Sequence, residues 1–337
     1  MGEGVDLSVV IVNWNVKVLL EKCLRSLCDV PGWRLMPPGA SVSQDSGRAM
    51  EIWVVDNASA DGSVDMVREA FPGVGLIANE ENIGFTRGNN QGIAQCRGRV
   101  VMLLNPDTEV LGSALEVMIG YLDAHPDVGV AGPRMFTPDG STQPSRRRFP
   151  TYGTAFVEST CLQQWFPRHP LLARYYMWDR FDDQEQDVDW LEGACLLARA
   201  EAVRQVGGLD ERFFMYSEEM DWCLRIKREG WRIVYLPAAR VVHHEARSSG
   251  QTPAAQQIHF HSSKVAYAAK HFGRLQAEIL RLFILAMYVY QMLEEGAKWL
   301  VGHKRDLRQQ RIGVYRRVLA SGLRAPKPKD AVASART

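Results

Sequence analysis

A carboxylate stands just past the end of a short apolar run in the first half of the chain. Residues 100–104 are Val-Val-Met-Leu-Leu, and Asn105-Pro106-Asp107 follow directly. An apolar run bounded by turn residues predicts a buried parallel strand. A side chain past the carboxyl end of such a strand points into the crevice where open α/β sheets bind ligands. The same residues also fit a plain turn, so the neighbouring segments must decide between the two interpretations.

Two earlier apolar runs follow the same plan. Residues 7–13 and 51–55 are typical of strands, and each run ends in polar residues. Apolar residues at helical spacing in 18–27 and 64–71 predict helices, and Asp61 is a candidate start residue for the second one. Strands that alternate with helices predict an α/β fold with a mostly parallel sheet and right-handed crossovers. No Gly-x-Gly-x-x-Gly follows the first strand, so the dinucleotide-binding fingerprint is missing.

Length and composition limit the classes of protein to which the chain can belong. The chain has 337 residues, of which 46% are hydrophobic, so one large domain with an extension can bury a sizeable core. Its six cysteines are scattered without the paired spacing of metal ligands, which favours a reducing compartment. Residues 1–6 are mostly polar, and the apolar run after them is too short for a signal peptide. We therefore expect a cytoplasmic protein.

The formal net charge of +1 conceals an asymmetry. Ten Lys or Arg residues and one acidic residue, Asp306, lie within 298–329, so this segment carries +9 and the remainder −8. Residues 279–293 are apolar except Arg281 and Gln291, and this run is shorter than the ~20 residues of a spanning helix. A short apolar helix before a basic one is typical of an anchor on anionic lipid. It equally fits a helix docked on the domain or on a second subunit, whereas no nucleic-acid-binding motif accompanies the basic residues.

Seven segments, in a fixed order, resemble the family 2 glycosyltransferases of the GT-A fold, especially the rhamnosyltransferase-like members. They are Val-Val-Ile-Val-Asn-Trp-Asn (9–15), Val-Val-Asp-Asn-Ala-Ser-Ala-Asp-Gly-Ser (54–63), Asn-Ile-Gly-Phe-Thr-Arg-Gly-Asn-Asn-Gln-Gly (82–92), Leu-Leu-Asn-Pro-Asp-Thr (103–108), Trp-Leu-Glu-Gly-Ala (190–194), Gly-Gly-Leu-Asp-Glu-Arg-Phe-Phe-Met-Tyr-Ser-Glu-Glu-Met-Asp-Trp-Cys-Leu-Arg (207–225) and Val-Val-His-His (241–244). Each segment alone is weak, but the ordered set is specific. The resemblance implies a mostly parallel sheet flanked by helices, with a C-terminal helical extension.

The resemblance assigns a divalent metal, Mg²⁺ or Mn²⁺, to the turn after 100–104. Asp107 matches the last residue of the family's Asp-x-Asp motif and is the expected ligand. Asn105 stands where many members have the first Asp, a variant that the rhamnosyltransferase-like members share. His243 matches a histidine that reaches the metal from the other side, and oxygen ligands with one imidazole suit these ions. The alternative for His243 and His244 is a strand end with hydrogen-bonded imidazoles.

The resemblance also identifies donor, acceptor and base residues. Asp56 matches the acidic residue that meets the nucleotide base, and the remaining donor-side residues are Asn13, Asn15, Asn82, Gly84 and Arg87. The segment Trp190, Glu192 and Gly193 faces the acceptor and the donor sugar. Glu219 matches the general base, with Glu218 and Asp221 as runners-up, although the family usually has Asp at that position. A negatively charged helix start is the structural alternative for these carboxylates. Arg146-Arg147-Arg148 fits either a phosphate-contacting loop or a plain solvated one.

These assignments suggest boundaries along the chain. We expect residues 1–250 to form the catalytic domain, with 29–49 as an inserted, mobile surface loop and 151–187 as a variable acceptor-side segment. Residues 251–324 should form a helical, amphipathic and basic extension, and 325–337 a disordered tail.

The sequence thus predicts a metal-dependent, inverting glycosyltransferase of bacterial polysaccharide assembly. The favoured donor is dTDP-L-rhamnose, and the acceptor is a glycan or lipid-linked glycan at the inner face of the cell membrane. A nucleotidyltransferase is one alternative, but its usual Gly-rich loop is replaced by Asn13-Trp14-Asn15. A non-catalytic assembly partner with the same fold is another, and a homodimer is compatible with either.

Overall fold

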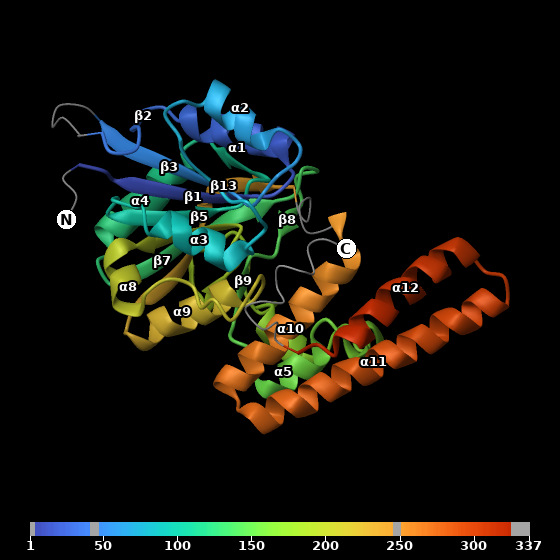
Figure 1. Ribbon diagram of the computed structural model, residues 1–337. Helices are drawn as coiled ribbons and strands as arrows, with labels where there is room; N and C mark the ends of the chain where they lie inside the picture. Colours follow the sequence, from blue (N-terminus) through green and yellow to red (C-terminus); the bar gives the residue numbers. More distant parts are fainter. Residues whose placement is uncertain (1–3, 41–46, 245–250, 325–337) are drawn as a thin grey trace. The chain divides into compact units, whose positions relative to one another are not determined.

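The computed structural model describes residues 4–40, 47–244 and 251–324 (Figure 1). The chain forms two compact units. As far as they are described, the first consists of Met1–Phe149, Met177–Glu211 and Glu218–Ser248, and the second of Pro150–Tyr176, Arg212–Ser217 and Ser249–Thr337. The second unit therefore includes two segments that lie within the expected 1–250 domain. The expected tail, 325–337, lies outside the described residues.

The first unit is built on one mixed sheet. Its strands are β1 (Leu7–Asn13), β2 (Trp33–Leu35), β3 (Arg48–Asp56), β4 (Gly75–Ala78), β5 (Val100–Leu104), β6 (Thr108–Leu111), β7 (Val128–Phe136), β8 (Thr142–Gln143), β10 (Gln186–Asp187), β12 (Cys195–Arg199) and β13 (Arg232–His243). The order is β10-β13-β7-β12-β5-β1-β3-β2, with β4, β6 and β8 beside β3, β13 and β7. Strands β2, β3, β4, β1 and β5 run in the same direction, whereas β12 is antiparallel to its neighbours β5 and β7. The predicted mostly parallel core is thus present, with an antiparallel strand inserted.

Helices cover both faces of this sheet. In the first unit they are α1 (Lys17–Cys28), α2 (Ser63–Ala70), α3 (Phe85–Ile93), α4 (Ala114–Ala124), α8 (Ala200–Val206) and α9 (Glu218–Arg228). Odd-numbered residues of β1, such as Leu7, share a hydrophobic core with α1, α2 and α4. On the other face, a Cβ at Gly92 or Gly88 of α3 would come within 2.3 Å of Val10 or 2.9 Å of Val12. Burial on both faces explains why this strand is almost continuously apolar.

Part of the expected surface loop 29–49 is regular structure. Trp33–Leu35 form β2 and pair in parallel with Arg48–Met50 at the start of β3. The Trp33 indole donates a hydrogen bond to Glu116 of α4. The prediction of one mobile loop is therefore wrong at both ends of the segment, because three strand residues among Pro and Gly are too few to give a period. Residues 41–46 lie outside the described part.

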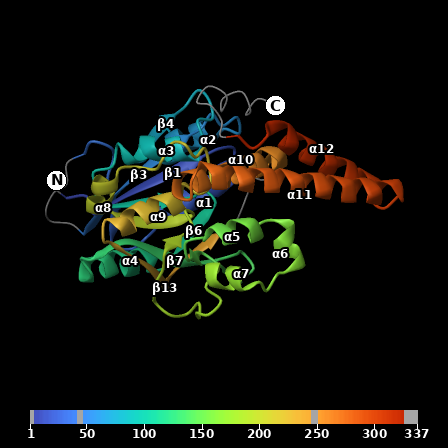
Figure 2. The ribbon, with the colours of Figure 1, turned by 90° about the horizontal axis from the view of Figure 1, so that it is seen from below.

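The second unit is helical in its described residues. Its helices are α5 (Tyr152–Val157), α6 (Cys161–Trp165), α7 (Pro170–Tyr175), α10 (Pro253–His271), α11 (Arg274–Leu300) and α12 (Arg305–Ser321). Leu280, Ile284 and Tyr288 of α11 are buried in a core that also contains Val318 of α12 and Ala268 of α10. Figure 2 shows α11 and α12 side by side as a helical hairpin. The apolar run 279–293 is thus the middle of one long helix.

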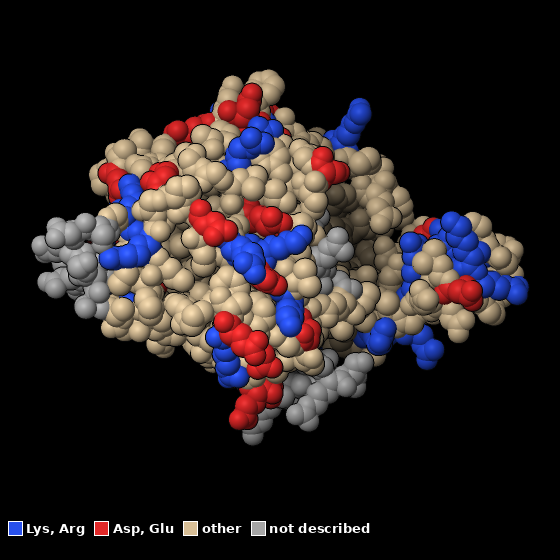
Figure 3. Space-filling model, turned by 90° about the horizontal axis from the view of Figure 1, so that it is seen from above, with Lys and Arg blue, Asp and Glu red and all other residues tan. Residues whose placement is uncertain are grey.

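None of the described helices is long and apolar enough to cross a membrane. Three cationic side chains of the expected basic stretch are held by carboxylates: Arg308 and Arg311 pair with Glu295, and Lys298 pairs with Glu294. Among the charged side chains of the lobe at the right of Figure 3, Lys and Arg nevertheless predominate over Asp and Glu.

Candidate functional site

Polar side chains lie at the carboxyl ends of β1 and β3. Asn13 and Asp56 are register partners, and Asn13 Nδ2 donates to Asp56 Oδ2 at 2.8 Å. The Ser59 N–H donates to Asp56 Oδ1 at 2.8 Å, and its hydroxyl accepts from Asn13 Nδ2 and the Asn15 N–H. Asn15, with φ +53°, accepts the Ala60 N–H on its side chain. Three predicted donor-side residues therefore lie in one hydrogen-bonded group, and the buried Asn13 Oδ1 has no partner among the described residues.

The loop before α3 joins this group. Asn57 Nδ2 donates to the Gly84 carbonyl at 3.2 Å, and the Gly84 N–H donates to Asn82 Oδ1 at 3.0 Å. Gly84 has φ +91°, a conformation that residues with a Cβ rarely adopt. Arg87, in the first turn of α3, pairs with Glu211 at 3.3 Å. Both side chains of that pair are well exposed, so the pair holds Arg87 only weakly.

Strand pairing brings Asp107 and His243 together. β6 runs antiparallel to the end of β13, so Thr108 lies opposite His243. His243 Nε2 lies 3.3 Å from Asp107 Oδ1 and 3.5 Å from Asn105 Nδ2. Both Asp107 and His243 are buried, and the His244 N–H donates to the Asp107 carbonyl at 2.8 Å. The two residues predicted as metal ligands therefore share one buried corner at the end of β5.

Gln143 orients the His243 ring and was not anticipated from the sequence. Its Nε2 donates to Glu192 Oε2 at 3.1 Å, so its Oε1 faces His243 Nδ1, 3.0 Å away. The Gln143 acceptor favours a proton on Nδ1, so in the neutral ring the Nε2 lone pair faces Asp107. Metal-binding histidines commonly have such a partner on the second nitrogen. No spacing or motif in the sequence marks Gln143, because its partners are 100 and 49 residues away.

The segment predicted to face the acceptor continues this network. Its strand β11 (Trp190–Leu191) pairs antiparallel with β9 (Arg146–Arg147) in a small second sheet. Glu192 accepts from Arg147 at 2.6 Å on one oxygen and from Gln143 on the other. A Cβ at Gly193 would lie 3.4 Å from Glu219 Cβ, so the two residues are neighbours. Glu192 thus lies between the His243 corner and the predicted base.

The three consecutive arginines are structural in this fold. Arg146 pairs with Asp182, Arg147 with Glu192, and Arg148 with Asp179. Arg146 and Arg147 are buried, and the Arg146 guanidinium also lies over the Tyr235 ring. The interpretation as a plain solvated loop is therefore wrong for these two side chains, whereas a contact with phosphate stays a prediction. The partners are distant in sequence, so a run of three arginines gives no sign of them.

Glu218 and Glu219 begin α9 in surroundings that favour their neutral forms. Glu218 is buried, and burial followed by the neighbouring Glu219 charge raises its pKa well above 4.5. Burial raises the pKa of Glu219 to about 7, with a smaller contribution from Glu192, while backbone N–H groups including that of Gly193 oppose the shift. One carboxyl oxygen of each has no hydrogen-bond partner among the described residues. A carboxylate with a pKa near 7 is suited to accept a proton.

Asp221 is in a different situation. It is fully buried and pairs with Arg225, one turn later on α9, at 2.9 Å. Arg225 also donates to the carbonyls of Val206 and Gly208. The Asp221–Arg225 pair therefore fastens the preceding loop to α9, which favours Glu219 over Asp221 as the base.

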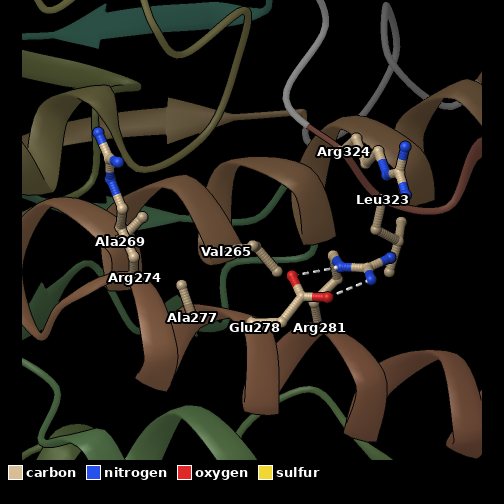
Figure 4. Close-up of a pocket in the computed structure, with 8 residues that line it drawn as sticks. All are labelled: Val265, Ala269, Arg274, Ala277, Glu278, Arg281, Leu323 and Arg324. Atoms are coloured by element: carbon tan, nitrogen blue, oxygen red, sulfur yellow. Dashed lines mark hydrogen bonds and ion pairs between the residues drawn. The ribbon is translucent and has the colours of Figure 1, made fainter.

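The structure contains a pocket of about 360 Å³ that does not belong to this group of residues (Figure 4). Its walls come from α10, α11 and the end of the described chain, with Arg274, Arg281 and Arg324 among them. Arg281 is engaged by Glu278 and by the Gly322 carbonyl. None of the predicted donor, acceptor or base residues lines this pocket.

The donor atoms near Asp107 fit a metal that is only partly held by protein. Among the residues that the structure describes, no three His, Cys, Asp or Glu side chains converge as a complete metal centre. Asp107 and His243 could supply two ligands, and the buried Asn105 Oδ1 has no partner in the described part of the chain. Cations such as Mg²⁺ are commonly bound by one or two carboxylates together with substrate phosphates.

Comparison with known proteins decides the family. The family model described as glycosyl transferase family 2 matches residues 8–185, and that of glycosyl transferase family group 2 matches residues 169–326. The chain belongs to glycosyl transferase family 2. An N-acetylglucosaminyl-diphospho-decaprenol L-rhamnosyltransferase of Mycobacterium tuberculosis is 33% identical over 261 residues, which are 74% of this chain and 84% of the relative. The low-salt glycan biosynthesis hexosyltransferase Agl10 of Haloferax volcanii is 25% identical over 86% of this chain and 85% of its own. The rhamnosyltransferase-like resemblance is thus confirmed.

Solved structures confirm the GT-A fold. The mannosyltransferase PcManGT from Pyrobaculum calidifontis has a TM-score of 0.52 at 16% identity, covering 95% of this chain and 87% of its own. TarS of S. aureus has a TM-score of 0.51 at 15% identity, covering 94% of this chain and 55% of its own. At such identities the likeness concerns the fold, a curled sheet flanked by helices with further helices after it.

Proposed function

We propose that this family 2 glycosyltransferase transfers L-rhamnose from dTDP-L-rhamnose to a hydroxyl of a lipid-linked glycan, with inversion. The observation that carries the proposal is the grouping of the Asp107–His243 corner, Glu192 and Glu219 within one unit, beside the polar ends of β1 and β3. The sugar and the lipid carrier are suggested by the mycobacterial relative, whose name specifies an L-rhamnosyltransferase acting on N-acetylglucosaminyl-diphospho-decaprenol.

Asp107, His243 and Asn105 would hold a divalent metal, Mg²⁺ or Mn²⁺. When bound, the metal supplies positive charge that stabilises the departing diphosphate. The support is the buried Asn105 Oδ1, which has no hydrogen-bond partner among the described residues, and the Gln143 acceptor at Nδ1, which in the neutral His243 ring directs the Nε2 lone pair toward Asp107. PcManGT, which shares the fold, was solved in complex with GDP-Man and Mn²⁺.

Glu219 is proposed as the general base. As the acceptor oxygen forms its bond to the anomeric carbon, the bond from that carbon to the diphosphate breaks, and the hydroxyl proton passes to the Glu219 carboxylate. Attack opposite the leaving group inverts the anomeric centre. A pKa near 7 allows the base to be ionised at neutral pH while it remains basic enough to accept the proton. Asn13, Asn15, Asp56, Asn82, Gly84 and Arg87 would receive the nucleotide.

A lipid-linked acceptor requires the enzyme to work at a membrane surface, and α11 offers a suitable face. Exposed apolar side chains recur along one side of this helix, at Leu275, Ile279, Leu282, Val289, Leu293 and Leu300. Leu275 and Leu300, at the two ends, are each 71% exposed. The basic side chains of α12 add attraction to anionic headgroups. We therefore propose peripheral contact through these helices at the cytoplasmic face, with a homodimer through the same stripe as the rival interpretation.

A screen of sugar nucleotides tests the function directly. The purified protein is titrated with dTDP-L-rhamnose, UDP-N-acetylglucosamine and GDP-mannose, with and without Mn²⁺ or Mg²⁺, while its melting temperature is recorded. We expect stabilisation by dTDP-L-rhamnose only when a metal is present, followed by transfer to a short-chain N-acetylglucosaminyl-diphospho-prenol. Binding without any transfer would instead favour the non-catalytic assembly partner.

A further inference from the structure

A row of amide side chains leads from α3, past the carboxyl ends of β4 and β3, to the loop before α3. Asn57 follows β3 and is buried, whereas Asn79 follows β4 and is partly buried. Asn79 Nδ2 donates to Asn57 Oδ1 at 3.0 Å, and Asn57 Nδ2 donates to the Gly84 carbonyl at 3.2 Å. On the outer side, Gln91 of α3 donates to Asn79 Oδ1 at 3.1 Å and accepts from Asn79 Nδ2 at 2.9 Å. All of these residues belong to the first unit.

The Gly84 carbonyl fixes the direction of this row. A carbonyl oxygen only accepts hydrogen bonds, so Asn57 must present its NH₂ group to Gly84 and its oxygen to Asn79. Asn79 must then present its own NH₂ group to Asn57. An oxygen at that place would face the Asn57 oxygen, and turning the Asn57 amide over would put that oxygen against the Gly84 carbonyl. The Asn79 NH₂ group therefore allows Asn57 to hold Gly84.

Gly84 is the residue at which the loop becomes helix α3. It is the N-cap residue, and its carbonyl also accepts the Gly88 N–H at 3.1 Å, a bond of the first helical turn. A Cβ at Gly88 would lie 3.6 Å from Asn57 Nδ2, so this turn packs directly on the Asn57 amide. The row of amides thus fixes the start of α3, which includes Arg87.

The main chain holds Asn57 and Asn79 independently of their side chains. The Asn79 N–H donates to the Asp56 carbonyl at 2.8 Å, and the Asn57 N–H donates to the Asn13 carbonyl at 2.9 Å. Replacing either side chain leaves these bonds in place. The effect of such a replacement should therefore be concentrated on the loop that the side chains hold.

We propose that Asn79 is a positioning residue for the donor nucleotide: through the Asn57 amide it holds the Gly84 carbonyl and so sets where the start of α3 meets the diphosphate. The inference rests on the proposed function, in which Asn82, Gly84 and Arg87 receive the nucleotide. The N-terminus of a helix attracts phosphate because its first N–H groups are unpaired and the helix dipole is positive there. A loop that must be ordered during binding lowers the affinity, so losing this hold should weaken donor binding.

Asn79→Asp tests the row with little change of shape, because it replaces the NH₂ group that faces Asn57 by an oxygen. Calorimetry on the full-length protein with Mn²⁺ gives the Kd of dTDP, and kinetics with dTDP-L-rhamnose give kcat and donor KM. Leaving the Asn57 oxygen without its donor should raise Kd and donor KM by about five- to fiftyfold. The kcat value should stay within about twofold of wild type, since only binding is affected. Gln95→Glu is the control: this exposed residue follows α3, and the substitution adds the same charge without touching the row.

Alanine variants test whether the effect passes through Asn57. Asn79→Ala and Asn57→Ala each remove one link and add no charge, so each should raise the Kd of dTDP. The double variant should bind dTDP no more weakly than Asn57→Ala alone, because without the Asn57 amide the Asn79 side chain is no longer linked to Gly84. Melting temperatures are recorded for every variant, and those of the two Asn79 variants should lie within a few degrees of wild type.

A wild-type Kd in Asn79→Asp, or additive effects of the two alanine substitutions, would overturn the positioning role. An equal loss of affinity in Gln95→Glu would also overturn it, because added charge alone would then explain the result. If Asn57→Ala does not fold, the two Asn79 variants and Gln95→Glu still decide. If the wild type binds UDP or GDP but not dTDP, the choice of donor fails, and the same comparison is made with the nucleotide that binds. Absence of binding to all three would refute the proposed function and this inference together.

Discussion

Replacing Glu219 by glutamine tests the role of its carboxyl group in two ways, through the rate of transfer and through the free energy of unfolding. Burial raises the pKa of Glu219 from 4.5 to about 7. The base must be ionised before it can accept a proton, so wild-type kcat/KM should rise about tenfold per pH unit below pH 7 and level off above it. Glu219→Gln should lower kcat by roughly 10²–10⁴-fold, the usual contribution of a general base.

The stability of the same variant should depend on pH in a defined direction. Because the pKa of Glu219 is higher in the folded state than in the unfolded state, its protonation favours folding. This contribution to the free energy of unfolding is complete below pH 4.5 and is lost as the pH rises through about 7. The difference between those two pKa values corresponds to roughly 3 kcal/mol at full ionisation. This figure is an upper limit, since Glu218 beside it titrates together with Glu219. Glutamine cannot ionise, so Glu219→Gln should increase the free energy of unfolding at pH 8 and change it little at pH 5.

Urea unfolding of wild type and variant at pH 5 and pH 8 measures this difference, and rates from pH 5 to 9 give the titration of the base. Glu229→Gln is the control, because Glu229 is exposed just after the same helix and should have no effect at either pH. A Glu219→Gln variant that is less stable than wild type at pH 8, or a wild-type rate profile with its acidic limb near pH 4.5, would refute the assignment of Glu219 as a base with a raised pKa.

Three further predictions concern the Asp107–His243 corner and the C-terminal helices. Asp107→Asn should abolish Mn²⁺-dependent binding of dTDP-L-rhamnose in calorimetry while leaving the melting temperature within a few degrees; retained metal-dependent binding would count against Asp107 as a ligand. Gln143→Leu should weaken the apparent Mn²⁺ affinity by about 10–100-fold, because His243 loses the partner that orients its ring, and an unchanged affinity in the same titration would show that this contact is unimportant. The double variant Leu282→Ser and Leu293→Ser should sediment less with anionic liposomes than wild type; if it instead changes the mass measured by light scattering, the stripe on α11 joins two copies.

The parts of the fold that the sequence predicted are those with local signals. Residues 7–13 and 100–104 form β1 and β5. Their apolar runs predicted this, because a strand that is covered on both faces needs apolar side chains on both. Helix α1 follows a 3.6-residue apolar period, with Leu20, Cys23, Leu24 and Leu27 all buried. Short strands such as β2 carry no period of their own and exist because a long strand, β3, offers a free edge.

Long-range pairing explains what the sequence left open at the site. The motifs marked Asp107 and His243 separately, and their 3.3 Å contact depends on β6 pairing with β13. The charges of Arg146 and Arg147 gave no sign that both residues are buried, because each needs a carboxylate from a later segment, Asp182 or Glu192. Burying an arginine is tolerated only with such a partner.

The Trp-Leu-Glu-Gly-Ala segment shows why a charged residue and a glycine are adjacent at this place. Gln143 and Arg147 donate hydrogen bonds to the two carboxylate oxygens of Glu192, and Gln143 in turn orients the His243 ring. Its negative charge also contributes to the raised pKa of Glu219 on the other side. Gly193 lets Glu219 pack closely against the backbone, whose N–H at this residue opposes the pKa shift. One segment therefore orients the Asp107–His243 corner and affects the pKa of the proposed base, so substitutions at Glu192 should alter the apparent metal affinity and the pH dependence of transfer together.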